Sequence, residues 1–229
     1  MSDAPGDAPV NAPGDAPGSA PASRAPRWPS PHTLGAILAG GESSRFGGKP
    51  KGLELVEGAR MIDRVAAALR EVTGELLLVA NDPGAGEWLP GARVVPDRVP
   101  KAGPLAGIQA ALHAANDRGV LVVAWDMPFV SAALLRAIAE RGEAAHAIVV
   151  PEARTGRAEP ACAYYPGDCL HALDRFLAEG RRRPAHFIEE YGCVARLGPP
   201  DLVAFGDPAR LLSSVNTPDE HARLTRGGE

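Results

Sequence analysis

Residues 38–53 combine glycines and positively charged side chains directly behind a short apolar run, and this pattern suggests a binding site for a polyphosphate. The segment reads LAGGESSRFGGKPKGL. Glycines let the backbone turn tightly and bring consecutive N–H groups against an anion. Arg45 offers a planar fork of donors to phosphate oxygens, while Lys49 and Lys51 supply point charges. A flexible, basic surface loop is the alternative that these residues alone leave open.

Two common nucleotide-binding motifs do not fit this segment. The phosphate-loop pattern requires Gly, four residues and then Gly-Lys-Ser/Thr, but Gly48-Lys49 is followed by Pro50, and Ser43 stands where the first glycine is required. The dinucleotide pattern G-x-G-x-x-G is absent as well. A phosphate cradle at this place therefore belongs to another class of nucleotide-binding protein.

Asp126 is the strongest candidate for a metal ligand. It follows the apolar run 120–125 and precedes Met127-Pro128, so it stands at the carboxyl end of an expected central strand. Ligands bind at this edge of open α/β sheets. A carboxylate there can hold Mg²⁺, which takes one or two protein carboxylates and completes its shell with water and phosphate oxygens. A helix-capping or turn aspartate is the alternative.

Three further polar residues stand beside expected elements or turns. Asn81 closes the apolar run 76–80, Asp97 stands shortly before the Gly-Pro-Leu-Ala-Gly sequence of residues 103–107, and Asn216 lies in Val-Asn-Thr-Pro. A side-chain amide can read the edge of a base or a ribose. The structural alternatives are a plain turn at Asn81 and simple helix starts after Gly103 and Asn216.

The elements that must position these residues alternate between strand and helix. Continuous apolar runs predict strands, apolar residues at spacings of three and four predict helices, and Ser131 can cap a helix. Alternation of this kind implies an α/β fold, a mostly parallel sheet with helices on both faces. The expected strands are 34–38, 75–80, 120–125, 147–150 and 161–165; the expected helices are 61–72, 105–115, 131–138, 169–178, 184–191 and one that begins at Thr217.

Composition divides the chain into a tail, residues 1–32, and a domain, residues 33–229. The tail consists mostly of Ala, Pro, Gly, Asp and Ser, with Gly-Asp-Ala-Pro repeated, and cannot bury enough apolar surface to fold. We expect it to be a disordered, dispensable extension, and it resembles neither a signal peptide nor a transit peptide. The domain has the size of one α/β unit.

Charge and cysteine content indicate the setting. A formal net charge of -4 gives no reason to expect nucleic acid as a partner, and no apolar run is long enough for a membrane span. Three cysteines without a C-x-x-C pair favour a reduced, cytoplasmic location, and we expect all three to be small interior residues. The six histidines show no ligand spacing.

The glycine-rich segment resembles the signature loop of the molybdenum cofactor guanylyltransferases, members of the wider nucleotidyltransferase family. That loop reads L-A-G-G, three residues, R-M-G-G, one residue, D-K-G-L. The chain departs from it at Phe46, in place of Met, and at Pro50, in place of Asp. The likeness spans residues 33–224 and is sharpest at the loop, at residues 103–107, at Asp126 and at residues 216–218.

The resemblance implies a three-layer, Rossmann-like sheet of the nucleotide-diphospho-sugar transferase type. It implies that GMP passes from GTP to the phosphate of molybdopterin or the molybdenum cofactor, with release of pyrophosphate, and that Mg²⁺ takes part. It also implies transient contacts with molybdoenzymes or their chaperones. Catalytic roles fall on Arg45, Lys51 and Asp126, with Asp126 holding the metal; cofactor-binding contacts fall on Leu38, Ala39, Gly40, Gly41, Gly47, Gly48, Lys51, Asn81, Asp97, Asp126 and Asn216.

Two segments carry weaker resemblances, and two functions remain as alternatives. Residues 157–160 are similar to an E-P-L segment of the family, and residues 180–183 to a basic helix end that contacts the second substrate's phosphate. A solvated helix terminus is the plainer interpretation of that basic run.

The alternative functions are a cytidylyltransferase for molybdopterin or another phosphorylated small molecule, and a catalytically silent nucleotide-binding regulator. The regulator stays open because Pro50 replaces the family's aspartate.

Overall fold

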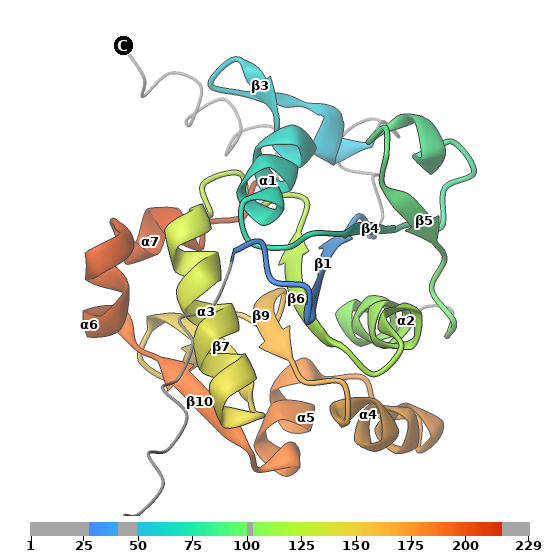
Figure 1. Cartoon of the computed structure of the whole chain (residues 1–229), viewed down its shortest axis with the longest axis vertical. Helices are drawn as coiled ribbons and strands as arrows, with labels where there is room; N and C mark the ends of the chain where they lie inside the picture. The colour runs from blue at the N-terminus through green and yellow to red at the C-terminus, as the bar shows by residue number, and fades with distance from the viewer. Residues whose placement is uncertain (1–27, 41–49, 100–102, 217–229) are drawn as a thin grey trace, which may run out of the picture.

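The computed structural model describes residues 28–40, 50–99 and 103–216, and within them a central β-sheet is covered by helices on both faces (Figure 1). The sheet contains eight strands in the order β10-β7-β9-β6-β1-β4-β5, with β8 paired to β7. The strands are β1 Thr33–Leu38, β4 Leu76–Val79, β5 Arg93–Val95, β6 Gly119–Ala124, β7 Ile148–Arg154, β8 Arg157–Ala158, β9 Cys162–Tyr165 and β10 Val194–Leu197.

Most strand pairs are parallel, as the sequence predicts. β1 runs parallel to both β4 and β6, and β4 to β5. β9 and β8 are exceptions: β9 pairs antiparallel with both β6 and β7, and β8 pairs antiparallel with β7. β1 and β4 are buried along their whole length, which explains their continuous apolar sequences.

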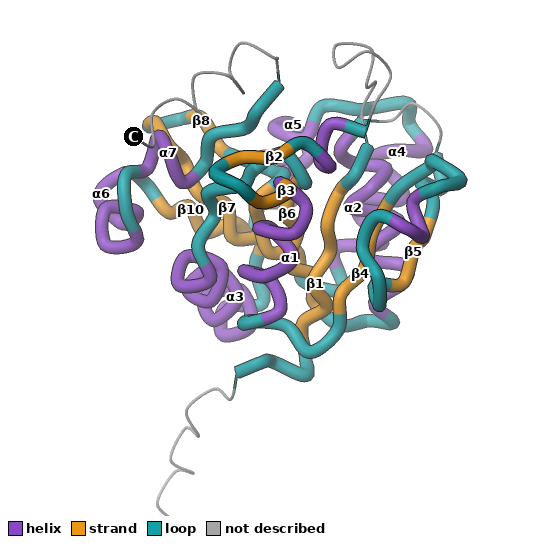
Figure 2. The backbone as a smooth tube through the Cα atoms, turned by 90° about the horizontal axis from the view of Figure 1, so that it is seen from above, coloured by secondary structure: helices purple, strands orange, loops and turns teal. Residues whose placement is uncertain are grey.

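The helices form two layers with separate hydrophobic cores. α1 and α3 pack on one face together with α6 and α7, while α2, α4 and α5 cover the other, and Figure 2 shows the strands between these groups. The helices are α1 Met61–Arg70, α2 Pro104–Ala115, α3 Ala132–Ala145, α4 Cys169–Ala178, α5 Pro184–Tyr191, α6 Pro199–Leu202 and α7 Pro208–Leu211. The expected three-layer α/β architecture is confirmed.

Local signals place the helix starts. Ser131 caps α3, since its hydroxyl oxygen accepts a hydrogen bond from the N–H of Leu134 at 3.2 Å. Gly103 has φ of 64° and ψ of -153°, a conformation open essentially to glycine, and Pro104 then occupies the first helical position of α2. The Gly-Pro pair is therefore a helix start. The helix expected at Thr217 lies outside the described residues.

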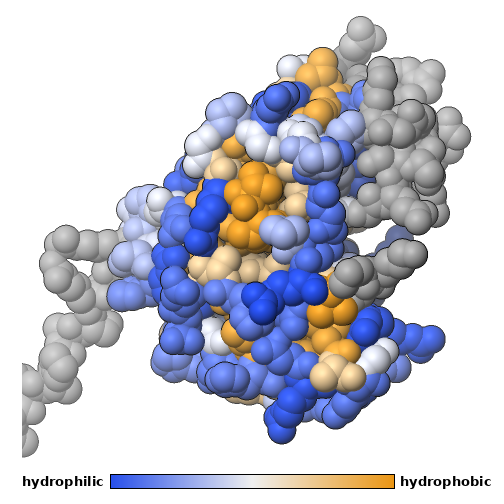
Figure 3. All heavy atoms as spheres, turned by 90° about the vertical axis from the view of Figure 1, so that its right-hand side faces the viewer, coloured by the Kyte–Doolittle hydropathy of each residue, from blue (hydrophilic) through white to orange (hydrophobic). Residues whose placement is uncertain are grey.

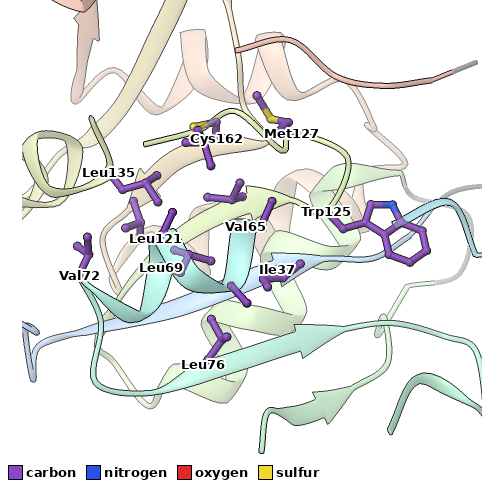
Figure 4. Packing of buried hydrophobic residues seen from close by; sticks show 14 of the residues in the cluster. Ile37, Val65, Leu69, Val72, Leu76, Leu121, Trp125, Met127, Leu135 and Cys162 are labelled. Atoms are coloured by element: carbon purple, nitrogen blue, oxygen red, sulfur yellow. The ribbon is translucent and has the colours of Figure 1, made fainter. Parts of the chain in front are cut away.

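A short hairpin connects the glycine-rich segment to α1. It consists of β2 Leu55–Val56 and β3 Ala59–Arg60, which pair antiparallel and lie between the turn at residues 51–53 and α1. Apolar side chains of the core that α1 covers meet those of β1 and β6, and Trp125 lies at one end of this packing (Figure 4). The hairpin and α1 thus anchor the segment that follows the signature loop.

Residues 28–32 lie against the domain ahead of β1. The N–H of Ser30 donates to the carbonyl of Val72 at 2.9 Å, and its hydroxyl donates to Glu143 at 2.6 Å. The indole N–H of Trp28 donates to Glu140 at 3.0 Å. The part of the predicted tail that the structure describes is therefore held by α3 and by the turn that follows α1. The boundary between residues 32 and 33 stays a prediction.

One expectation about the cysteines is wrong. Cys162 and Cys169 are buried free thiols, as expected, but Cys193 is exposed. It lies in the short connection between α5 and the edge strand β10. None of the helices in the described ranges has the length and apolar character needed to cross a membrane.

Hydrophobic atoms also reach the surface on the side that carries β5 and α2. Figure 3 shows that they gather toward the middle of this face, with hydrophilic residues around them. This side of the molecule includes one end of the sheet, at the edge strand β5.

Candidate functional site

A cavity of about 720 Å³ opens at the carboxyl ends of the central strands. It extends over the ends of β5, β4, β1 and β6 to the residues before β9, and the start of α2 borders it. This is the edge at which the sequence predicts ligand binding. Its lining comprises Leu38, Gly40, Val79, Asn81, Asp97, Gly103, Pro104, Gly107, Ala124, Trp125, Asp126, Met127, Glu159, Ala161 and Ser214.

The cavity brings most of the described candidates together. Leu38, Gly40, Asn81, Asp97 and Asp126 line it directly. Ala39 is buried just below, with its N–H donating to the carbonyl of Val79 at 2.9 Å. Lys51 and Asn216 reach the site through Asp126, as described next. Gly41, Arg45, Gly47 and Gly48 lie outside the described residues, so their roles stay predictions.

Lys51 lies between Asp126 and Asn216. Its ammonium group forms an ion pair with Oδ2 of Asp126 and donates a hydrogen bond to Oδ1 of Asn216 at 3.0 Å. The Lys51 and Asp126 side chains are only 16% and 9% exposed, so solvent screens this pair less than a surface pair. Two oxygen ligands from distant parts of the sequence thus converge on one positive charge.

Backbone hydrogen bonds hold the three segments of this cluster. The N–H of Val215 donates to the carbonyl of Asp126 at 2.9 Å, which brings Asn216 beside the end of β6. The N–H of Trp125 donates to the carbonyl of Leu38 at 3.1 Å, which joins that same end to β1. Lys51 begins a single 3-10 turn, Lys51–Leu53, that Pro50 initiates by accepting from the N–H of Leu53 at 3.0 Å.

Trp125 is a site residue that sequence reasoning missed. It is buried, lines the cavity and stacks on Trp88 with ring centroids 5.3 Å apart. Its indole N–H has no hydrogen-bond partner within the described residues. A Cβ atom added at Gly52 would lie 2.3 Å from its ring. The available signal in the sequence was an aromatic residue directly before the candidate aspartate. Its role in the site becomes evident only from the tertiary contact with Gly52.

Asn81 and Asp97 form a reciprocal pair across the ends of β4 and β5. The Asn81 amide donates to Oδ2 of Asp97 at 2.8 Å, and its Oδ1 accepts from the Asp97 N–H at 2.8 Å. Gly107 on α2 faces this pair, since a Cβ there would approach Leu38 to 3.0 Å and Asp97 to 3.6 Å. Small residues at the start of α2 therefore leave the floor of this half of the cavity open.

Glu159 lines the cavity on the side of β9. Burial, reinforced by the negative charge of Asp126, raises the pKa of the Glu159 carboxyl, although a hydrogen bond from the N–H of Ala161 and the positive charge of Arg157 act in the opposite direction. The likeness of residues 157–160 to a family segment was the only sequence signal for it, and no role was assigned. Among the described residues, its carboxylate has no ion-pair partner.

The basic run at residues 181–183 ends a helix, in agreement with the plainer of its two interpretations. Arg182 donates to the carbonyl of Leu177 at 2.7 Å, which satisfies the end of α4. Arg181 forms ion pairs with Glu190 and Glu179 and lies 4.0 Å from the ring centre of Phe176. Neither arginine belongs to the cavity lining found among the described residues.

This fold, with its cavity at the carboxyl edge of the sheet, is that of the nucleotidyltransferases. The chain belongs to the family of the MobA-like NTP transferase domain, which residues 35–194 match. That match begins inside β1 and ends at the first residue of β10, so it includes most of the sheet and every cavity-lining residue except Ser214.

Two relatives carry the same description. The chain is 36% identical to the molybdenum cofactor guanylyltransferase of Cereibacter sphaeroides over 193 residues, which is 83% of this chain and 94% of that protein. It is 35% identical to the probable molybdenum cofactor guanylyltransferase of Chloroflexus aggregans over 196 residues, 81% and 90% of the two chains.

Solved structures give the same fold. Molybdopterin-guanine dinucleotide biosynthesis protein A from Archaeoglobus fulgidus superposes with a TM-score of 0.71 at 27% identity, covering 84% of this chain and 97% of that chain. The 2-C-methyl-D-erythritol 4-phosphate cytidylyltransferase of Thermus thermophilus superposes with a TM-score of 0.60 at 20% identity, over 83% and 96%, and this likeness concerns the fold alone.

Proposed function

We propose that the chain transfers a guanylyl group from GTP to the phosphate of molybdopterin or of the molybdenum cofactor. The observation that carries this proposal is the convergence of Lys51, Asp126 and Asn216 beside Gly40, at the start of the glycine-rich loop. Such a cluster can neutralise a polyphosphate at the carboxyl edge of the sheet. We infer the identity of the substrates from the names of the relatives, because the cluster itself suits any nucleoside triphosphate.

In the proposed reaction, a phosphate oxygen of the acceptor forms a bond to the α-phosphorus of GTP. The bond between that phosphorus and the oxygen bridging to the β-phosphate breaks, and pyrophosphate leaves with the electron pair. The chain supplies position and charge rather than a nucleophile. We assign Lys51 to the charge that builds on the transferred or leaving group, and Arg45 with the loop glycines to the phosphates.

The residues present fit a magnesium ion. Asp126 and Asn216 both direct oxygen atoms at one positively charged group, and oxygen ligands are the ones that Mg²⁺ selects. Within the described residues no cluster of three or more His, Cys, Asp or Glu side chains could hold a metal by itself, which agrees with an ion that relies on substrate phosphates. When bound, Mg²⁺ would neutralise developing negative charge on the phosphates. We assign Asp126, with Asn216, to hold it.

The other half of the cavity suits the nucleoside. Asn81 and Asp97 offer amide and carboxylate groups to a base or ribose, and Gly103 and Gly107 leave space in front of them. We assign Leu38, Ala39 and Gly40 to contacts with the nucleotide, at the place where the nucleoside half of the cavity meets the half that holds the phosphates. These groups do not choose between guanine and cytosine, so a cytidylyltransferase remains the second candidate.

The geometry around Pro50 favours an active enzyme over a silent nucleotide-binding regulator. Pro50 replaces an aspartate of the family signature, yet its carbonyl begins the turn in which Lys51 still reaches Asp126. The fixed φ of proline suits that position, where φ is -63°. The departure therefore leaves the pairing of Lys51 with Asp126 in place.

The product must reach other proteins, so we propose transient contacts with molybdoenzymes or their chaperones. The three free cysteines agree with the cytoplasmic setting that we propose from the sequence.

Mass analysis of the product formed from GTP, Mg²⁺ and molybdopterin tests the function, with CTP assayed in parallel. We expect a guanine dinucleotide and stoichiometric pyrophosphate from GTP, and little product from CTP. Asp126→Asn should abolish pyrophosphate release while the protein stays folded. Asp63→Asn is the matched control, because Asp63 pairs with Arg60 on the surface of α1. Product from CTP alone would replace the proposal with cytidylyl transfer, and binding without release would support the regulator.

A further inference from the structure

We propose that Glu159 recognises the acceptor substrate. Its carboxylate accepts hydrogen bonds from the 2-amino group and the adjacent ring N–H of the acceptor's pterin. This inference rests on the proposed function, because it takes the pterin from the proposed acceptor. It assigns a specificity-determining role to a residue in the half of the cavity that the nucleoside does not use.

The order of strands separates the two halves. Asn81 and Asp97 follow β4 and β5, whereas Glu159 precedes β9, and β1 and β6 lie between them in the sheet. Asp126 follows β6 and so stands between Glu159 and the Asn81–Asp97 pair. With the phosphates beside Gly40 and Asp126, a nucleoside over β4 and β5 leaves the side of β9 to the second substrate.

The segment that carries Glu159 is held firmly. The N–H of Glu159 donates to the carbonyl of Pro151 at 2.9 Å, and its carbonyl accepts from the N–H of Cys162 at 3.0 Å. The carbonyl of Ala161 accepts from the N–H of Ala124 at 2.7 Å, and the hydroxyl of buried Tyr165 donates to the carbonyl of Pro160 at 2.9 Å. A side chain on such a support is preorganised for recognition.

The Glu159 carboxylate has acceptor capacity left over. Oε1 accepts from the N–H of Ala161 at a long 3.3 Å, and neither oxygen forms an ion pair within the described residues, although the positive charge of Arg157 acts on the carboxylate without pairing with it. A carboxylate withdrawn from water, near the like charge of Asp126, is costly unless donors meet it. A ligand that brings two N–H donors would remove that cost.

A pterin brings such a pair of donors. Its 2-amino-4-oxo ring presents an amino group beside a ring N–H, two roughly parallel donors that match the two oxygens of a carboxylate. Guanine presents the same edge, so the hydrogen-bonding chemistry has two sources in this reaction. The position of Glu159, across Asp126 from Asn81 and Asp97, assigns it to the pterin.

The test uses two probes that differ at one group, 6-hydroxymethylpterin phosphate and its lumazine counterpart, in which oxygen replaces the 2-amino group. Their fluorescence gives dissociation constants with the full chain. We expect the pterin to bind about tenfold or more tightly than the lumazine, the size expected for hydrogen bonds to a charged group. Glu159→Gln should bring the two constants within about twofold, because one donor would face the Gln amide. The ratio is insensitive to the fraction of folded protein.

GTP and ITP form the second arm, since ITP lacks the 2-amino group of guanine. Glu159→Gln should leave their affinity ratio and the Mg²⁺ affinity unchanged. Asp97→Asn is the matched carboxylate change in the nucleoside half and should weaken GTP binding while preserving the pterin preference. A Glu159→Gln protein that loses discrimination between GTP and ITP, or that binds Mg²⁺ more weakly, would place Glu159 with the nucleotide and overturn the inference.

The outcomes separate this inference from the proposed function. If the wild-type chain prefers the pterin through Glu159 but forms no dinucleotide from GTP and molybdopterin, guanylyl transfer is wrong and the assignment of Glu159 stands. If the dinucleotide forms and Glu159→Gln retains the pterin preference, only the assignment of Glu159 is wrong. Failure of the wild-type chain to distinguish the pterin from the lumazine also overturns the assignment.

Discussion

Gly52 packs against the indole ring of Trp125 so closely that no side chain fits between them. A Cβ atom at residue 52 would lie 2.3 Å from Cε3 and 2.5 Å from Cδ2 of Trp125, well inside van der Waals contact. Gly52 is the neighbour of Lys51, and Trp125 is the neighbour of Asp126. The contact between Gly52 and Trp125 therefore sets the separation of the two segments that carry the Lys51–Asp126 ion pair. Packing against Trp125 thus explains the glycine after Lys51.

Gly52→Ala should destabilise the protein and weaken catalysis. Trp125 has little room to retreat because it is buried and stacks on Trp88 at 5.3 Å. Forcing one methyl group into such a place typically costs about 1–3 kcal/mol of unfolding free energy. Urea unfolding measures the change, and pyrophosphate release measures the displacement of Lys51. Gly74→Ala is the control, because no atom lies within 4 Å of a Cβ there; equal stability of the two variants would contradict the prediction.

Lys51→Met should slow guanylyl transfer and strengthen Mg²⁺ binding in the absence of nucleotide. The ammonium occupies the point at which the Asp126 and Asn216 oxygens converge, so a cation must compete with it there. Loss of a group that stabilises transition-state charge lowers kcat by about 10²–10³-fold in comparable sites. Steady-state kinetics gives the first effect and isothermal titration with MgCl₂ gives the second.

Arg60→Met serves as the control for Lys51→Met, since it removes a cation from a surface pair with Asp63. It should change neither measurement. Weaker Mg²⁺ binding by the Lys51 variant would show that the ammonium supports the metal site and does not compete with the ion.

Much of this fold can be predicted because its central elements carry strong local signals. β1, β4 and β6 are continuous apolar runs, and α4 and α5 begin and end where their sequence patterns predict. The edge strands β5 and β10 escaped prediction because they are short and partly exposed, so their apolar patterns are weak. α6 and α7 are single turns of four residues with little periodicity to detect.

The site was predictable where it follows the topology. Asn81 and Asp126 stand at the ends of predicted strands, and a parallel sheet brings such ends to one edge. Asp97 follows β5, which escaped prediction, and only its place before residues 103–107 pointed to it. The approach of Gly52 to Trp125 and the place of Glu159 depend on contacts between segments about 70 and 33 residues apart in sequence, which no local pattern encodes. The exposed position of Cys193, directly before the edge strand β10, likewise depends on the tertiary structure.

Asn81→Ala should raise the KM for GTP with little change in kcat. It removes both hydrogen bonds that orient Asp97, each 2.8 Å long, far from the reacting phosphates. Loss of a positioned polar contact of this kind corresponds to about tenfold in affinity, or about 1.4 kcal/mol. Initial rates at varied GTP measure it. Asp82→Ala is the control, because Asp82 is the neighbouring residue and lies outside the cavity lining. An equal effect of both changes on KM would mean that Asn81 only forms the turn and does not contribute to GTP binding.

The protein should lose stability as the pH rises from about 10 to about 12. Burial is the main cause that raises the pKa of Tyr164 to about 12, and the negative charge of Glu143 adds to it. An unfolded tyrosine ionises near pH 10, so between these values the unfolded state releases a proton that the folded state retains. The folded state binds more protons in this window, and its unfolding free energy therefore falls as pH increases.

Tyr164→Phe should flatten that dependence by at most about 1.4 kcal/mol per pH unit, the value for one whole proton, with the larger part of the effect above pH 10. Urea unfolding at pH 9, 10 and 11 gives the slopes for the two proteins. Absorbance at 295 nm provides an independent check, because tyrosinate should appear together with unfolding and not before it. Tyr165 is also buried and its pKa is raised well above the ordinary value, so the variant should keep a residual slope. Identical slopes in wild type and variant would mean that Tyr164 ionises in the folded protein as readily as in the unfolded chain.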